Sequence, residues 1–323
     1  MYRSSFQFRL TVQDNNGEVL RREELKDFRP CLEEVLFSAV LSGEVPNDSK
    51  TPAVEIEPVG DTQSLTGFRV RLGGQARDFG VNTVLDRVLR ITSEAKLSDE
   101  ESERPSPQLS WWVDATPKQD PEGPRKLRAT LSRQPYPISE RPLADWGIEP
   151  GPGASRGLRV LVSSNLLEDL RQQTAGSLET ERADLLAGYL LRESSEAAVV
   201  VLTGRIPADT DTTASKTHVS FSPLTFHAAQ QQLSHRPEDA ILGWHHNHPP
   251  PCGQLCLATV PACKTASVFF SVDDREVHRA SFAAPFMVAL VSGKGSGQRA
   301  DDPIVRAYGW KDGVVEPIEY AVF

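Results

Sequence analysis

The chain has 323 residues, which is long enough for two domains, and its 39% hydrophobic and 24% charged residues are ordinary for a globular protein. Its formal net charge of −9 argues against general binding to nucleic acid or to anionic membranes. No apolar run approaches the ~20 residues of a transmembrane helix, and the start of the chain lacks the apolar core of a signal peptide. We therefore expect a cytoplasmic protein whose cysteines are reduced or metal-bound.

Residues 1–134 predict an N-terminal α+β domain. Alternating or continuous apolar patterns predict strands, and apolar residues at helical spacing predict helices. The expected strands are 6–13, 53–59, 67–72, 109–115 and 126–133, and the expected helices are 31–42 and 82–92. Residues 97–107 are acidic, contain two prolines and predict a loop. The domain contains no motif that we can assign, and we expect it to recognise a substrate or partner.

Residues 135–156 predict a linker, because prolines and glycines recur there and deny regular structure. Residues 157–323 then predict a second domain, a mixed β-sheet flanked by helices, which places the whole chain in the α+β class. Its expected strands are 158–162, 197–203, 218–221, 241–248, 286–291, 304–310 and 318–323. One helix is expected over 165–175 with Ser164 as its N-cap, and another from Pro223 to about 235 with Ser222 as its N-cap.

The histidines are concentrated in the second domain. All seven lie between His218 and His278, and three of the four cysteines lie in the same window. His246 and His248 end an apolar strand, in the stretch Gly-Trp-His-His-Asn-His-Pro that starts at Gly243. Side chains two apart on a strand share a face, so the two imidazoles can bind one metal ion. His245 points to the other face and has a structural or supporting role.

Three further residues can complete a catalytic metal site. Asp274 is the natural third ligand, because two imidazoles and a carboxylate form a known catalytic zinc set. Glu181 can take a proton from the attacking water, and Ser271 can donate a hydrogen bond to a developing oxyanion.

Each residue alone also has a simpler interpretation. Ser271 and Asp274 have the spacing of a helix capping box, which is compatible with a ligand role for the aspartate. Glu181 alone would be a solvated charge at the end of a helix.

Taken together and in this order, Glu181 with Gly188, His-x-His-Pro from His246, and Ser271-x-x-Asp274 resemble the signature of the JAMM (MPN+/JAB) metalloproteases. The resemblance covers about residues 157–323. It implies that His246, His248 and Asp274 bind Zn²⁺, that Glu181 is the general base and that Ser271 stabilises the oxyanion.

The resemblance also implies an activity. The chain would be a metallopeptidase, specifically a deubiquitinase-like isopeptidase or peptidase that cleaves after the C-terminus of a ubiquitin-like protein in a bacterium. Its partners would be that modifier or its conjugates, with E1-like and E2-like enzymes of the same pathway. Two alternatives stay open: a hydrolase acting on a sulfur-carrier-protein adduct, and a non-catalytic JAMM-like binding scaffold.

One segment departs from the family pattern. The family places a much shorter segment between the second histidine and the serine, whereas 22 residues from Pro249 to Phe270 separate them here. This insertion contains Cys252, Cys256 and Cys263, which can hold a second, structural zinc with a fourth ligand such as His278. Buried free thiols and redox chemistry are the other interpretations.

Overall fold

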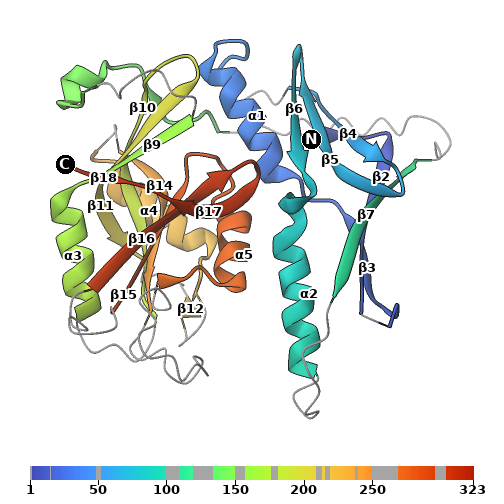
Figure 1. Cartoon of the computed structure of the whole chain (residues 1–323). Helices are drawn as coiled ribbons and strands as arrows, with labels where there is room; N and C mark the ends of the chain where they lie inside the picture. The colour runs from blue at the N-terminus through green and yellow to red at the C-terminus, as the bar shows by residue number, and fades with distance from the viewer. Residues whose placement is uncertain are drawn as a thin grey trace. The chain divides into compact units, whose positions relative to one another are not determined.

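The computed structural model describes residues 2–14, 16–48, 52–98, 109–118, 134–149, 157–175, 181–208, 213–214, 219–236, 239–248, 268–294 and 303–323. The chain divides into two compact units. The first comprises Met1–Val40, Glu44–Tyr136 and Asp312–Val314, and the second comprises Leu41–Gly43, Pro137–Lys311 and Val315–Phe323. Helices and sheets occur in both, which confirms the mixed α+β class (Figure 1).

The first unit combines two small sheets with helices. Its elements are β1 (Tyr2–Arg3), β2 (Phe6–Gln13), β3 (Val19–Leu25), α1 (Arg29–Leu41), β4 (Val54–Asp61), β5 (Ser64–Leu72), β6 (Gln75–Gly80), the 3₁₀ turn η1 (Val81–Val84), α2 (Leu85–Ser98) and β7 (Ser110–Pro117). Within the described residues, the strands form one sheet in the order β1-β4-β5-β6 and another in the order β3-β2-β7. The predicted helices and most predicted strands are confirmed, whereas β3 and β6 were missed.

Alternation along β5 shows how this unit builds its core. Phe68, Val70 and Leu72 are buried, while Arg69 and Arg71 between them point outward and pair with carboxylates on the neighbouring strands. Edge-to-face contacts with ring centroids 5.0–5.3 Å apart join Phe68 to Phe8 and Phe28. The core therefore rests on aromatic packing between the two sheets.

The second unit is built on one large mixed sheet. Its elements are β8 (Ile138–Ser139), η2 (Leu143–Trp146), β9 (Gly157–Val162), α3 (Ser164–Ala175), β10 (Ala183–Arg192), β11 (Ala197–Pro207), β12 (Thr213–Ala214), β13 (Val219–Ser220), α4 (Pro223–Leu233), β14 (Ala240–Asn247), α5 (Val272–Ser281), β15 (Val288–Lys294), β16 (Pro303–Lys311), β17 (Val314–Ile318) and β18 (Ala321–Val322). The strand order is β17-β16-β15-β14-β10-β11-β9-β18, with β8 beside β10. The strand β14 is antiparallel to β10 and parallel to β15.

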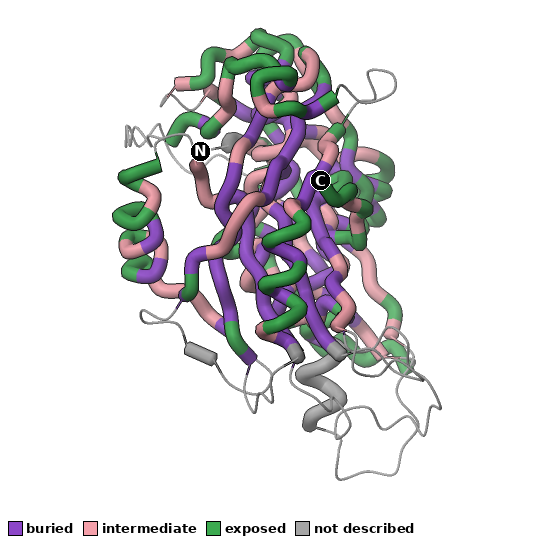
Figure 2. Tube along the Cα trace, turned by 90° about the vertical axis from the view of Figure 1, so that its left-hand side faces the viewer, coloured by how far each residue is buried: buried purple, intermediate pink, exposed green. Residues whose placement is uncertain are grey.

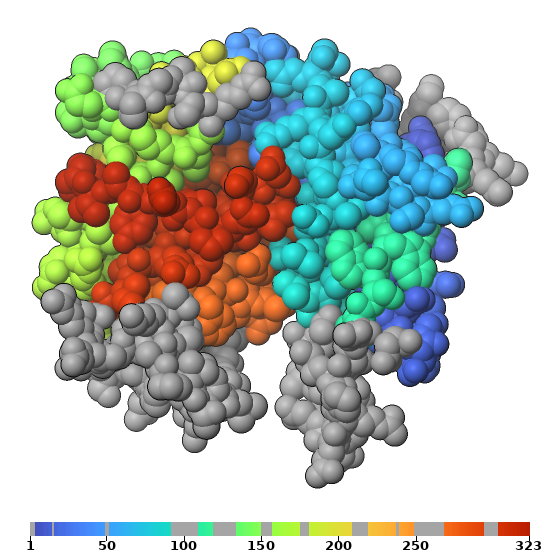
Figure 3. Space-filling view, in the orientation of Figure 1, coloured from blue at the N-terminus to red at the C-terminus, as the bar shows by residue number. Residues whose placement is uncertain are grey.

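The two faces of this sheet are covered by different helices. The helix α3 contacts β11, β15 and β16, and Figure 2 shows it in front of strands whose residues are mostly buried. On the other face, the core includes residues of β10, β14, β15 and β16 packed with Ala229 of α4 and with Phe282, which follows α5. In the space-filling view α5 (orange) lies at the surface below the C-terminal strands (red) (Figure 3).

Two glycines of the family-like motif, Gly188 and Gly243, allow neighbouring strands to approach closely. A Cβ atom at Gly188 would lie 1.8 Å from the carbonyl oxygen of Val201 on β11. A Cβ atom at Gly243 would lie 1.8 Å from the carbonyl oxygen of Val288 on β15. Any larger residue would therefore push β10 or β14 away from its neighbour and shift the strand ends that carry the candidate site.

Part of the predicted linker is folded. β8 pairs in parallel with β10, and Leu143 and Ile148 pack in a buried cluster with Leu161, Leu191 and Val199. The prolines and glycines break regular structure, as predicted, but the apolar residues among them are buried against the sheet. Residues 150–156 and the strand expected at 126–133 lie outside the described residues.

Two further predictions in the second unit were wrong in detail. The hydroxyl that caps α3 belongs to Ser163, whose Oγ accepts from Leu166 N–H at 3.2 Å, while Ser164 is already helical. The strand expected at 318–323 is replaced by β17 and β18, which lie at opposite ends of the sheet order. Since only two residues separate them, at most ~11 Å of chain, the sheet curls and brings its two edges together.

None of the helices in the described parts of the chain has the length and apolar character needed to cross a bilayer.

Candidate metal centre

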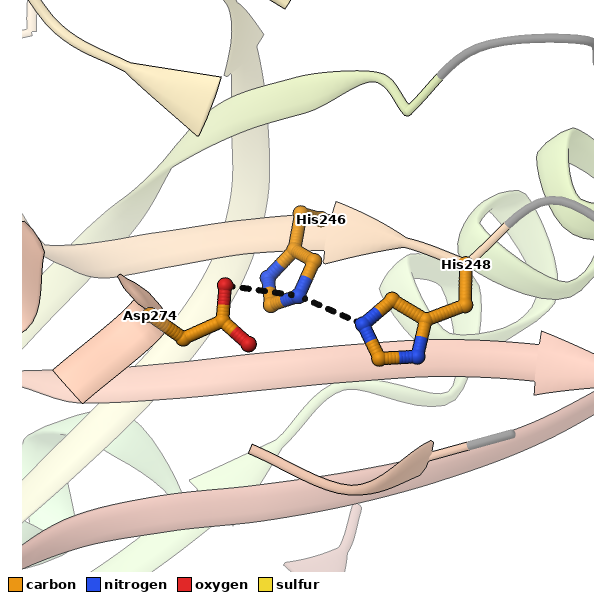
Figure 4. Close-up of side chains that lie close together, drawn as sticks. All are labelled: His246, His248 and Asp274. Carbon is orange, nitrogen blue, oxygen red and sulfur yellow. Dashed lines mark hydrogen bonds and ion pairs between the residues drawn. The ribbon is translucent and has the colours of Figure 1, made fainter. Parts of the chain in front are cut away.

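The end of β14 brings two imidazoles together. His246 and His248 have exposed fractions of 0% and 6%. Their Nε2 atoms lie 3.1 Å apart, and Figure 4 shows both rings on the same side of the strand. This is the arrangement expected from strand alternation.

Asp274 reaches the same point from α5. Its Oδ1 lies 3.4 Å from His246 Nε2, whereas its Oδ2 accepts a hydrogen bond from Ser271 N–H at 2.7 Å. Ser271 Oγ in turn accepts from Asp274 N–H at 3.1 Å, which completes a capping box. The two interpretations of this motif therefore coexist, because one carboxylate oxygen caps the helix and the other faces the histidines.

The spacing of these atoms fits a metal ion. Ligands about 2.0–2.1 Å from a tetrahedral metal lie roughly 3.3–3.4 Å from one another. The two separations of 3.1 Å and 3.4 Å are close to this value, and the three ligand atoms all lie within 4.8 Å of one another. His246, His248 and Asp274 thus form a buried group that can hold a metal ion.

The electrostatics of the group point the same way. Burial raises the pKa of Asp274, but His246 and the hydrogen bonds from Ser271 lower it more, so the carboxylate stays ionised. Burial lowers the pKa of His246, yet Asp274 and Glu181 raise it above its ordinary value. Negative charge therefore draws a cation to the His246 ring, and a metal ion would replace the proton there.

Glu181 lies just before β10 and is buried, with an exposed fraction of 6%. The interpretation as a solvated charge at a helix end is therefore wrong. Burial, with smaller contributions from Asp274 and Asp273, raises the pKa of Glu181 to about 7, although His246 lowers it. Its Oε2 is buried and has no hydrogen-bond partner among the described residues. A carboxyl group with these properties can exchange a proton near neutral pH.

Two buried rings, Trp244 and His278, form an aromatic wall beside His246. The Trp244 ring stacks on the imidazole with centroids 4.7 Å apart and planes at 16°. Trp244 Nε1–H donates to Nδ1 of His278 on α5 at 3.0 Å, and burial lowers the pKa of His278 to about 3, so this ring is neutral. One ring nitrogen of His278 therefore accepts the hydrogen bond from Trp244. The sequence analysis considered His278 only as a fourth ligand of the cysteine zinc site and missed this role.

Phe269 was also missed by the sequence analysis. Its ring lies 4.9 Å from that of His248 and has an exposed fraction of 47%. It places an accessible apolar surface next to a candidate ligand. Its position two residues before Ser271 could have singled it out.

The remaining predicted residues are placed as follows. Cys252, Cys256 and Cys263 lie outside the described residues, so the second zinc site stays a prediction. His245 is buried on the opposite face of β14. His227 on α4 and His235, two residues after its end, are exposed.

Comparison with known proteins assigns no family to the chain. No family model matches it, and no curated protein matches it. Among solved structures it is similar to the solution structure of protein DSY2949 from Desulfitobacterium hafniense, with 18% identity over 51% of this chain and 92% of that chain. The TM-score of 0.35 is too low for this similarity to carry an argument. The geometry of the centre is therefore the basis for its interpretation.

Proposed function

We propose that the protein is a zinc-dependent isopeptidase or peptidase of the JAMM type, which cleaves after the C-terminus of a ubiquitin-like modifier in the bacterial cytosol. The observation that carries the proposal is the convergence of His246, His248 and Asp274, with buried Glu181 interacting electrostatically with the same group. The order of these residues along the chain, with Ser271 three residues before Asp274, supports the resemblance to this family.

Zinc is the metal that suits this set of ligands best. Two imidazoles and one carboxylate are a known catalytic zinc set, and three protein ligands leave a fourth position for water or substrate. Structural zinc sites instead use four protein ligands. The donor set therefore favours a catalytic ion.

The residues of the chain have separate roles in the proposed reaction. Bound zinc supplies Lewis-acid polarisation of the scissile carbonyl and lowers the pKa of water. Glu181 takes the proton of the attacking water and delivers it to the leaving amine. Ser271 O–H donates to the oxyanion that develops on the carbonyl oxygen. His246, His248 and Asp274 hold the ion, and the stacked Trp244 ring fixes the orientation of His246.

The proposed substrate has an extended C-terminal tail. Such a tail can bind by adding a strand to an exposed sheet edge, a common mode of peptide recognition. The first unit contains no grouped metal ligands among its described residues, and we propose that it recognises the modifier, its conjugates or the E1-like and E2-like enzymes of the pathway.

A Glu181→Gln variant tests the assignment of the base. The substitution keeps the shape of the side chain but removes its ability to accept a proton. Zinc content is expected to stay at the wild-type level, while cleavage of a ubiquitin-like protein fused to a fluorogenic amide falls at least ~100-fold. Chelation of zinc should abolish cleavage by the wild-type protein, and added zinc should restore it. Cleavage that survives either treatment would contradict the mechanism.

The substrate class needs a separate comparison. A sulfur-carrier protein with an amino acid attached at its C-terminus should be assayed beside the modifier fusion, at equal concentrations. Faster release of the amino acid would favour the carrier-adduct hydrolase. Bound zinc with cleavage of neither substrate would favour a binding scaffold.

A further inference from the structure

Two side chains at the end of β14 point away from the metal group, His246, His248 and Asp274, and are also buried and polar. His245 and Asn247 alternate with His246 and His248, so they face the opposite side of the sheet. Both have exposed fractions of 0%. Polar side chains at such positions are retained where they have hydrogen-bond partners, and these partners indicate what the two residues do.

His245 connects β14 to both of its neighbours in the sheet. Its Nδ1 lies 3.0 Å from Asp184 Oδ2 on β10, and its Nε2 lies 2.8 Å from Ser292 Oγ on β15. In the neutral ring, Nδ1–H donates to the carboxylate and Nε2 accepts from the serine hydroxyl. The ring therefore links β14 to both adjacent strands through side-chain hydrogen bonds, in addition to the backbone pairing.

Ser292 extends this connection directly to a candidate ligand. Its backbone carbonyl accepts from His248 N–H at 2.8 Å, while its Oγ lies 2.6 Å from Thr174 Oγ1 on α3. One residue thus holds the His245 ring and the backbone of His248. A change at the Ser292 hydroxyl would be transmitted to the position of His248 through this pair of contacts.

Asn247 connects β14 to the segment that carries Glu181. Its side-chain Oδ1 accepts from the backbone N–H of Arg182 at 2.7 Å, and its backbone N–H donates to Arg182 O at 3.2 Å. Arg182 follows Glu181 directly in the sequence. The side chain between the two histidine ligands therefore fixes the backbone next to the candidate base.

We propose that His245 and Asn247 are positioning residues of the metal centre, with separate tasks. His245, through Ser292, sets the place of His248 and hence the affinity for the metal. Asn247, through Arg182, sets the place of Glu181 and hence proton transfer. The inference rests on the proposed function and assigns to this site two residues that touch neither metal nor substrate.

The task of His245 is tested by metal affinity, which requires no substrate. His245→Phe removes both ring hydrogen bonds, and Ser292→Ala removes only the hydroxyl and serves if the first variant does not fold. Zinc affinity, measured by competition with a chromophoric chelator on folded protein, is expected to fall about 10-fold, as for other residues that orient metal ligands. Val199→Ala, a buried change on β11 outside this network, is the control and should leave the affinity unchanged. An affinity of Ser292→Ala within twofold of wild type would overturn this assignment.

The task of Asn247 is tested by separating kcat from KM. Asn247→Ala, fully loaded with zinc, is expected to lower kcat at least ~10-fold, because a displacement of about 1 Å at a catalytic group can cost 100-fold in rate. Zinc affinity and KM should change less than threefold. A merely structural residue would lower the fraction of folded protein without this selective loss of kcat, and that result would overturn the assignment.

Failure of the proposed function would look different. If the wild-type protein binds zinc but cleaves neither substrate, the peptidase proposal fails, while the affinities of the His245 and Ser292 variants still decide the positioning role. If those affinities equal that of wild type and cleavage is normal, the positioning proposal alone fails.

Discussion

The two faces of β14 use buried polar side chains in different ways. On the face toward the metal group, His246 Nδ1 and Glu181 Oε2 are buried without a hydrogen-bond partner among the described residues. On the other face, the His245 ring is bonded at both nitrogens, to Asp184 and to Ser292, and Asn247 Oδ1 is bonded to Arg182, although Asn247 Nδ2 has no partner among the described residues. Buried polar groups are normally paired, so the unpaired carboxylate oxygen of Glu181 marks where a proton acceptor lies near the metal group.

Two buried carboxylates, Asp184 on β10 and Glu181 just before this strand, also differ in how far their negative charge is compensated. Burial raises the pKa of Asp184, but its hydrogen bond to His245 and its ion pair with Arg205 at 2.8 Å lower the pKa more strongly. No arginine among the described residues contributes to the pKa of Glu181, which is raised to about 7. A compensated carboxylate stabilises the fold, whereas an uncompensated one is suited to proton transfer.

The largest expected effect is loss of the metal when a ligand is removed. His248→Ala should weaken zinc binding about 1000-fold, which is one ligand's share of a zinc-binding free energy of ~10–16 kcal/mol. The free energy of unfolding of the metal-free protein should fall by only about 1 kcal/mol, because a hydrogen bond such as that between His248 and His246 contributes about this much. Isothermal titration and urea unfolding in chelator measure the two quantities. Equal losses in the free energies of zinc binding and of unfolding would show that His248 stabilises the fold as much as it binds the metal.

The reverse result is expected on the other face. Asp184→Ala leaves His245 and Arg205 without their shared carboxylate and should lower the free energy of unfolding of the metal-free protein by about 3 kcal/mol. The value is at the low end for a broken buried pair, because Arg205 keeps its contact with Asp169 at 2.6 Å. Urea unfolding in chelator measures it. A loss below ~1 kcal/mol would show that this network does not hold the sheet together.

The contrast between the faces explains which parts of the site could be predicted from the sequence. The spacing of His246 and His248 and the capping-box pattern of Ser271 and Asp274 are local, so strand and helix periodicity sufficed to place them. The partners of His245 lie 61 and 47 residues away along the chain. Only the register of β10, β14 and β15 brings them together, and no local pattern encodes that register.

Contacts between residues far apart in the sequence also account for the errors in the predicted fold. Strands with strong apolar patterns, such as β11 and β14, were predicted, whereas β3, with a mostly exposed pattern, was missed. The break between β17 and β18 was missed because its cause is the curl of the sheet. Leu143 and Ile148 were assigned to a linker because prolines and glycines surround them in the sequence, whereas the residues they pack against lie on distant strands.

A smaller effect is expected in the pH dependence of cleavage. Glu181 must be ionised to accept a proton, so kcat/KM should rise with pH as this group loses its proton. A bound cation favours the carboxylate, which places the acidic limb at or below pH ~7. Below that pKa, the rate should fall about tenfold per pH unit.

Two variants test whether the ionisation of Glu181 causes the acidic limb of the pH profile. The residual rate of Glu181→Gln should show no limb, whereas Val199→Ala should retain it. A limb that persists in Glu181→Gln would assign the titration to another group and remove the argument from the raised pKa.

The smallest expected effect concerns the aromatic wall. Trp244→Phe keeps a ring beside His246 but removes the N–H that His278 Nδ1 accepts. We expect a loss of about 1 kcal/mol in the free energy of unfolding, because a buried acceptor is left without its donor, and a zinc affinity about threefold weaker. The double variant Trp244→Phe with His278→Phe should recover stability, since replacing both partners by apolar rings removes the unpaired group. If the double variant is instead less stable than Trp244→Phe alone, His278 contributes through a contact other than this hydrogen bond.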